Sequence, residues 1–461
     1  MVSRDSQWHE LRAIEIVCEE GAIPAQKQSP HSIAVSMYTL SLPSSSRRIE
    51  RREVRKALAE KNKSSNLAGR IQELDGIRGV AISMVLFRHF FLDTTQFRLG
   101  SPLAYAVVPF RLTWSGVDLF FVLSGFLIGG ILLDARDASN YFRVFYTRRF
   151  FRIVPMYSIT LICFCALSGL VKAGITRKLW WMTANPIPWY SYVLFAQNFW
   201  MASKNTLGTY GLGPTWSLAV EEQFYLTLPL LIRTLTQRSL SRVLIAGILA
   251  APLLRIVLYV LWPKHFFAWL VLMPCRADAL LLGVLGVVIW RNPRLRFLLE
   301  SKRRTFEYVL ALMATGIVFL TLRSPSQFSV VMLSVGYTWL AVSYIGFLLY
   351  ALIFRSSVLS RFLCSSWLVW LGTIAYGTYL LHELVMANVF GLLWSRSPSI
   401  LSLRDLYPSL VSLVLTLCIC RYSWIYFEKP LVRFGHRLAY KPSATASAER
   451  IGNLADESRP V

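Results

Sequence analysis

An arginine and a histidine share one face of the first strongly apolar segment. Arg78 and His89 are eleven residues apart, between Leu74 and Asp93. In an α-helix this spacing is about three turns, so both side chains point the same way, about 16 Å apart. A neutral imidazole can take a hydroxyl proton near pH 7, and a guanidinium can stabilise an oxyanion. A lone histidine in an apolar helix is usually only packed, but the same-face arginine favours catalysis.

Carboxylates stand in two later apolar segments. Asp118 is near the start of one, and Glu221 and Glu222 are one turn into the other. We expect both segments to begin on the outer side of a membrane, so that these acids share its outer half with His89. His382, in a still later segment, reaches the same depth. Each acid alone could simply pair with an arginine, but together they indicate a general base oriented by a carboxylate.

Two further arginines could bind phosphate. Arg149 and Arg152 are three residues apart, followed by Pro155, so they face one way at the inner end of a helix. Each guanidinium can form a bidentate pair with phosphate oxygens. The alternative is that they only anchor the helix on the cytosolic side, as basic residues often do.

The elements that carry these residues are predicted to cross a membrane. The chain has 461 residues, of which 55% are hydrophobic and 16% charged. Runs of about 20 apolar residues recur, enough to cross a hydrocarbon core about 30 Å thick. We therefore predict an all-α, polytopic transmembrane helical bundle of about ten spans: 74–93, 114–134, 151–170, 215–234, 242–262, 268–290, 306–323, 330–354, 366–390 and 408–427.

Lysine and arginine alternate along the chain in a way that predicts the orientation. The basic residues gather around 136–152, 233–242 and 291–304, and the intervening connections are poorer in them. Both termini are therefore expected on the cytoplasmic side. The same placement explains the net charge of +24 without a nucleic-acid partner. Membrane lipids are the expected surroundings.

Three regions follow from this pattern. Residues 1–66 form a basic, Ser-rich segment, predicted to be a disordered cytosolic tail, and residues 441–461 a short polar cytosolic tail. The transmembrane domain covers 67–440. Its longest connection, 171–214, is external and rich in aromatic residues, which could anchor at the membrane interface or cover a site. The cysteines form no C-x-x-C pair, and no metal site is expected.

Taken in order, these segments resemble the acyltransferase-3 family of polytopic membrane O-acyltransferases, which modify surface glycans, lipopolysaccharide and nodulation factors. The resemblance spans roughly 70–435. It rests on motifs that occur here in the family's order: Arg78-x10-His89, Gly116-Val117-Asp118-Leu119-Phe120-Phe121, Arg149-x-x-Arg152, Trp216-Ser217 with Glu221-Glu222, Arg276-x-Asp278, Tyr379 with His382, and Glu428-Lys429-Pro430.

The resemblance implies an activity and a set of roles. Acyl-CoA, by default acetyl-CoA, would be a cytosolic co-substrate, with no permanently bound cofactor, and a hydroxyl-bearing glycan or lipid the acceptor. The membrane would be the bacterial inner membrane. The catalytic set would be His89, Arg78, Asp118, Glu221 and Glu222, with Arg149 and Arg152 binding the donor. His382, Tyr379, Trp216, Arg276 and Asp278 would position the acceptor. Many relatives carry an esterase-like domain after the last span, and this chain is expected to be a stand-alone member.

Two other functions fit part of the pattern. Charged residues inside a membrane also line the substrate paths of transporters, although we find no repeated halves. A membrane acyltransferase of another family could also be built around a buried histidine, but would lack Arg78-x10-His89. Arg88, beside the histidine, is the main departure from the family's pattern, and we expect it to pair locally or reach toward the interface. The oligomeric state stays open.

Overall fold

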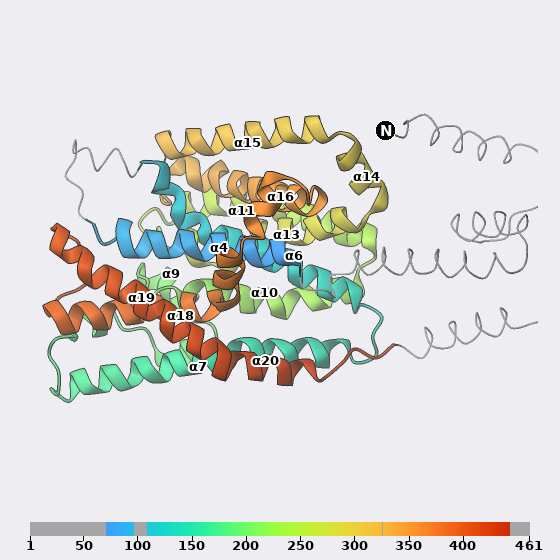
Figure 1. Cartoon of the computed structure of the whole chain (residues 1–461). Coiled ribbons are helices and arrows are strands. Elements are labelled where there is room, and N and C mark those ends of the chain that lie inside the picture. Colours follow the sequence, from blue (N-terminus) through green and yellow to red (C-terminus); the bar gives the residue numbers. More distant parts are fainter. Residues whose placement is uncertain (1–70, 96–107, 325, 443–461) are drawn as a thin grey trace, which may run out of the picture. The chain divides into compact units, whose positions relative to one another are not determined.

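The computed structural model describes residues 71–95, 108–324 and 326–442, and every named element in these ranges is a helix. The tail predicted at 1–66, and all but the first two residues of the tail predicted at 441–461, lie outside the described residues. The long helices, shown in Figure 1, are α4 (Gln72–Phe87), α6 (Gly116–Asp134), α7 (Tyr141–Lys172), α10 (Thr215–Thr234), α11 (Gln237–Leu261), α13 (Met273–Arg291), α15 (Arg303–Arg323), α16 (Tyr337–Ile353), α18 (Ser366–Trp394) and α19 (Leu406–Ser423).

Each of the ten predicted spans coincides with one of these helices, so the all-α prediction is confirmed for the described residues. Seven of the helical segments are long and apolar enough to cross a membrane by length and composition. The other three long helices are α4, α10 and α18, which carry Arg78, Glu221, Glu222, Tyr379 and His382 among other polar residues. Polar side chains lower the mean hydropathy of a helix without shortening it, so a count of ten spans stays a prediction.

The interior is built from two close helix pairs, with α4 packed along α18 and α6 along α13 (Figure 1). Glycine permits both approaches. A Cβ on Gly125 of α6 would lie 1.9 Å from the carbonyl oxygen of Leu280. A Cβ on Gly372 of α18 would lie 1.9 Å from that of Asp75. No side chain fits at such distances, so these backbones touch directly, as small residues allow in membrane helix pairs.

The third helix differs from its predicted bounds. We predicted a span from residue 151, after a basic loop, but α7 begins at Tyr141 and runs for 32 residues. Arg149 and Arg152 therefore lie two to three turns inside the helix and do not cap it. Pro155 lies within α7 as well. Membrane helices tolerate proline where neighbouring groups satisfy the freed carbonyl. A prediction based on apolar runs places the start of a helix too late when, as here, its first turns are basic.

The predicted orientation can be tested with two single cysteines. Ser203, in the connection between α7 and α10, and Ser301, before α15, are both exposed. In a background without the native cysteines, we expect an impermeant maleimide added outside cells to label Ser203→Cys and spare Ser301→Cys. Permeabilised cells should label both. Labelling of Ser301→Cys alone in intact cells would show that the orientation is the opposite of the predicted one. The sides of the membrane assigned to the donor and to the acceptor would then be exchanged.

Candidate active site

Two neighbouring cavities lie among α4, α6, α10 and α18. The arginine cavity has a volume of about 210 Å³ and is lined by Arg78, Arg149, Arg152 and Glu221, with apolar residues of α6. The histidine cavity has a volume of about 250 Å³ and is lined by His89, Asp93, Asp118, Trp216, Arg276 and Glu383, among others. Val117 and Tyr379 line both. The side chains of Val117 and Tyr379 therefore form a wall that the two cavities share.

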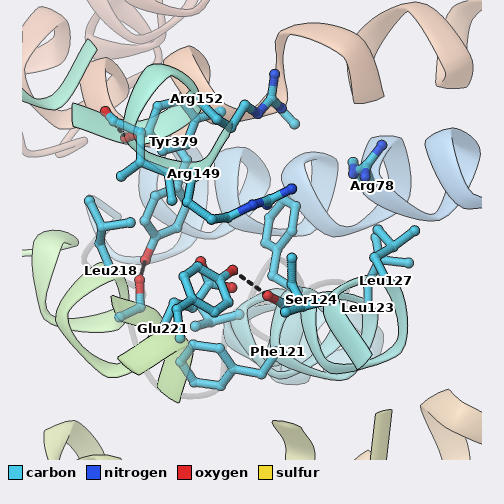
Figure 2. A pocket seen from close by; sticks show the side chains of 18 of the residues that line it. Arg78, Phe121, Leu123, Ser124, Leu127, Arg149, Arg152, Leu218, Glu221 and Tyr379 are labelled. Carbon is cyan, nitrogen blue, oxygen red and sulfur yellow. Dashed lines mark hydrogen bonds between the residues drawn. The ribbon is translucent and has the colours of Figure 1, made fainter. Parts of the chain in front are cut away.

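Three guanidinium groups meet in the arginine cavity. Figure 2 shows Arg78, Arg149 and Arg152 on one side of it and Glu221 on the other. Their surroundings differ. Nη1 of Arg78 donates to Asp75 at 2.5 Å. The Nε of Arg149 is buried without a hydrogen-bond partner. A buried donor without a partner is costly, so Arg149 is the arginine best prepared to take an anionic group.

Arg152 is held by aromatic rings. Its guanidinium lies 5.8 Å from the ring centroid of Tyr376 on α18 and 5.5 Å from that of Trp424. Trp424 begins a π-helical turn, Trp424–Glu428, that continues α19. These cation–π contacts fix the position of the guanidinium while leaving its N–H groups able to donate.

The two adjacent glutamates of α10 are separated from the histidine. Glu221 lines the arginine cavity, close to a hydrogen bond of 2.5 Å between Ser124 and Tyr225 (Figure 2). Glu222 lines neither cavity, and its Oε1 is buried without a partner. Neither glutamate therefore lines the cavity of His89, and their catalytic role stays a prediction.

His89 contacts a second histidine. The helix α4 ends in a π-helical turn, Arg88–Leu92, that carries it. Its Nδ1 lies 2.7 Å from Nε2 of His382 on α18, with the two rings stacked at 4.8 Å. The predicted convergence of these two histidines is thus present in the structure. Because α4 and α18 pack along each other, the pair lies between two helices of the interior.

The carboxylates nearest His89 are ones that the sequence analysis did not assign. Its Nε2 lies 3.8 Å from Asp93 and 4.0 Å from Glu383. Two signals pointed to them, since Asp93 is four residues after His89 and Glu383 directly follows His382. Arg88 pairs with Asp93 at 2.5 Å, which is the local pairing expected for that arginine.

Two buried ion pairs hold the interior helices. Arg276 of α13 pairs with Asp118 of α6, and both are almost inaccessible to solvent. Asp278 accepts hydrogen bonds from Arg255 of α11 at 3.0 Å and from Thr338 of α16 at 2.6 Å. Asp118 and Arg276 line the histidine cavity, but Asp278 lines neither cavity. Asp278 thus ties three helices together, and its acceptor role stays a prediction.

The aromatic connection between α7 and α10 covers the histidine cavity. Leu207, Tyr210, Gly213 and Pro214 line it. Burial, with a further contribution from Glu383, raises the pKa of the Tyr210 phenol well above its usual value, so its hydroxyl stays a donor. Elsewhere the connection is exposed, as at Trp180 (65%) and Trp189 (74%). The connection thus has both features that we considered, a cover over the cavity and exposed aromatic residues suited to an interface.

Ser217 contacts Tyr379, one of the two residues that line both cavities. The tyrosine hydroxyl lies 2.6 Å from Ser217 Oγ and donates to the carbonyl oxygen of Pro214 at 3.1 Å. Trp216, beside Ser217, packs edge-on against Phe121. Tyr379 and Trp216 therefore reach the histidine cavity from two different helices, as their predicted roles require.

One cluster among the described residues could hold a metal ion. His89, His382 and Glu383 each offer one ligand atom, and these atoms lie within 4.8 Å of one another. The hydrogen bond between the imidazoles already occupies the two ring nitrogens that face each other. The arrangement as it stands is a hydrogen-bonded pair of histidines beside carboxylates.

The chain is similar to known proteins over most of its length. A family model described as an acyltransferase domain matches residues 71–423. Peptidoglycan O-acetyltransferase OatA of Listeria monocytogenes is 25% identical over 381 residues, 79% of this chain and 56% of that protein. O-acetyltransferase OatA of Staphylococcus aureus is 24% identical over 400 residues, 82% of this chain and 60% of that protein. The chain thus spans a little over half the length of these relatives. No solved structure matches it.

Proposed function

Because the chain belongs to the acyltransferase-3 family, we propose that it transfers an acyl group, by default acetyl, from cytosolic acyl-CoA to a hydroxyl of a surface glycan or a similar acceptor. The observation that carries this proposal is the pair of adjoining cavities, one with three arginines and the other with a histidine pair. The relatives' printed names support acetyl as the acyl group and peptidoglycan as one kind of acceptor.

In this proposal the arginine cavity receives the donor. The phosphates of CoA would pair with Arg149 and Arg152, and the pantetheine arm would lie along the apolar residues of α6, such as Leu123 and Leu127. The thioester would then reach the wall formed by Val117 and Tyr379, at the boundary with the histidine cavity.

The acceptor hydroxyl would enter the histidine cavity. His89 takes the hydroxyl proton as the oxygen attacks the thioester carbonyl, forming a tetrahedral oxyanion. Collapse of this intermediate breaks the C–S bond, and the CoA thiolate leaves and takes up a proton. A thioester is already activated, so the protein's tasks are positioning, proton removal and oxyanion stabilisation. Tyr210 and Tyr379 supply hydroxyl groups at this cavity, and Arg78, which lines the adjoining arginine cavity, is the cation that the sequence suggested for the oxyanion.

The decisive experiment uses purified protein with acetyl-CoA labelled in its acetyl group. We expect release of CoA that depends on an added acceptor, with the label recovered on an acceptor hydroxyl. A transporter would bind or move a solute without breaking the thioester. Transport of a solute by the protein in vesicles, with the thioester intact under every acceptor tried, would favour that alternative.

The donor site gives a quantitative prediction. Arg149→Ala should raise the apparent KM for acyl-CoA by about 10- to 100-fold, because one charge-assisted contact is worth about 1.5–3 kcal/mol. We expect Arg152→Ala to have the smaller effect, since Tyr376 and Trp424 already engage its guanidinium.

The matched control for these variants is Arg143→Ala. Arg143 lies on the same helix but is exposed and lines neither cavity. Its removal should leave the KM for acyl-CoA unchanged. An unaltered KM in the Arg149→Ala/Arg152→Ala double variant would show that both arginines only anchor α7.

A further inference from the structure

The fully buried ring of His382 has its hydrogen-bond direction set by the backbone. Its Nδ1 lies 2.8 Å from the carbonyl oxygen of Tyr379 and 3.2 Å from that of Thr378. A carbonyl oxygen can only accept, so Nδ1 of His382 must carry the hydrogen. In the neutral ring the lone pair is then on Nε2, the nitrogen that faces His89.

This arrangement determines the tautomer of His89. The distance of 2.7 Å between its Nδ1 and Nε2 of His382 leaves room for one hydrogen, and the lone pair of His382 must accept it. Neutral His89 is therefore protonated on Nδ1 and has its own lone pair on Nε2. That nitrogen faces the histidine cavity, where the side chain of His89 is 25% exposed.

The surroundings favour the opposite tautomer when His382 is removed. Nε2 of His89 faces the carboxylates of Asp93 and Glu383, at 3.8 Å and 4.0 Å. Carboxylates accept hydrogen bonds, so an unconstrained His89 would carry its hydrogen on Nε2 and turn its lone pair away from the cavity. The same carboxylates stabilise the imidazolium once Nε2 has taken a proton, and Arg88 moderates the charge of Asp93 at 2.5 Å.

We propose that His382 is a positioning residue that holds His89 in the Nδ1–H tautomer, so that Nε2 can accept the proton of the acceptor hydroxyl. The catalytic part of this inference rests on the proposed function. It replaces the role of acceptor positioning that the sequence suggested for His382. The ring that selects a tautomer is thus a neighbouring histidine anchored on two backbone carbonyls of α18.

The first test reads the tautomer directly, without catalysis. The chain has six histidines, few enough for each ¹⁵N-histidine signal to be assigned by single substitution in the purified protein. We expect His89 to be protonated at Nδ1 in the wild type and to shift to Nε2–H in His382→Leu. A wild-type His89 that carries its hydrogen on Nε2 would overturn the inference whatever the enzyme's activity.

The second test separates positioning from acceptor binding. His382→Leu should lower kcat about 10²-fold or more, with the acceptor KM changed little. His382→Gln should recover most of this loss, because its amide oxygen can accept the hydrogen from His89. A raised acceptor KM with unchanged kcat would return His382 to acceptor positioning. If the tautomer is as inferred but His89 proves dispensable, the proposed mechanism fails and the structural pairing stands.

Discussion

His89→Gln should lower kcat by about 10²–10⁴-fold while leaving folded protein in the membrane. Glutamine keeps the size of the side chain and some of its hydrogen bonding, but it cannot accept a proton. His89 is the histidine whose free nitrogen faces a cavity beside two carboxylates, so no other imidazole of the described residues should substitute for it. Transfer measured at saturating acetyl-CoA and acceptor, per folded molecule, is the appropriate quantity.

His265→Gln is the matched control for this experiment. His265 lies between α11 and α13 and lines neither cavity, so this variant should keep wild-type kcat. If His89→Gln stays close to wild type and Glu383→Gln loses activity, then the carboxylate of Glu383 is the base and His89 only supports it.

The helices could be predicted from the sequence because each depends on a local property. An apolar run of sufficient length must form a helix in a membrane, whatever it packs against. The predicted span 215–234 coincides with α10, and 366–390 lies within α18. The start of α7 was missed by ten residues because its first turns are basic and aromatic, and no apolar run signals them.

The partners of the polar residues could be predicted less well, because pairing depends on which helices pack together. The predicted spans placed Asp118, Glu221 and His89 at one depth in the membrane. Depth alone does not determine which cavity a side chain lines. Two carboxylates at the histidine, Asp93 and Glu383, were overlooked although each stands close to a histidine in the sequence. The spacing of four residues between His89 and Asp93 already favours their contact on a helix. Glu383 reaches the same ring through the packing of α18 against α4.

Arg255 was overlooked for a different reason. It stands in the apolar part of α11, after Arg238 and Arg242 at the start of that helix, and is fully buried. Because placing a charged side chain in a membrane costs free energy, such an arginine needs a partner. This requirement predicts a contact more strongly than helix periodicity does. If Arg255 had been paired with Asp278, the acid of the following long helix, their contact would have been predicted from the sequence alone.

The second large effect concerns the other buried pair, Asp118 and Arg276. Asp118→Asn should destabilise the protein by about 3–5 kcal/mol, because it leaves a buried guanidinium without its carboxylate. The Nε and Nη1 of Arg276 already lack hydrogen-bond partners. Without the carboxylate its guanidinium keeps the cation–π contacts with Tyr337, Trp216 and Phe121, which are weaker than an ion pair. The thermal midpoint and the monodisperse fraction of the detergent-purified protein measure this effect.

Removing both charges should restore the fold. In Asp118→Asn/Arg276→Gln neither helix buries an unpaired charge, and we expect a midpoint much closer to the wild type than that of either single variant. Single variants as stable as the wild type would contradict a structural pair.

The rescued protein also decides the catalytic role assigned to Asp118 from the sequence. We expect its kcat to stay within about tenfold of the wild type, since the carboxylates next to His89 are Asp93 and Glu383. A folded double variant as inactive as His89→Gln would instead return Asp118 to the catalytic set.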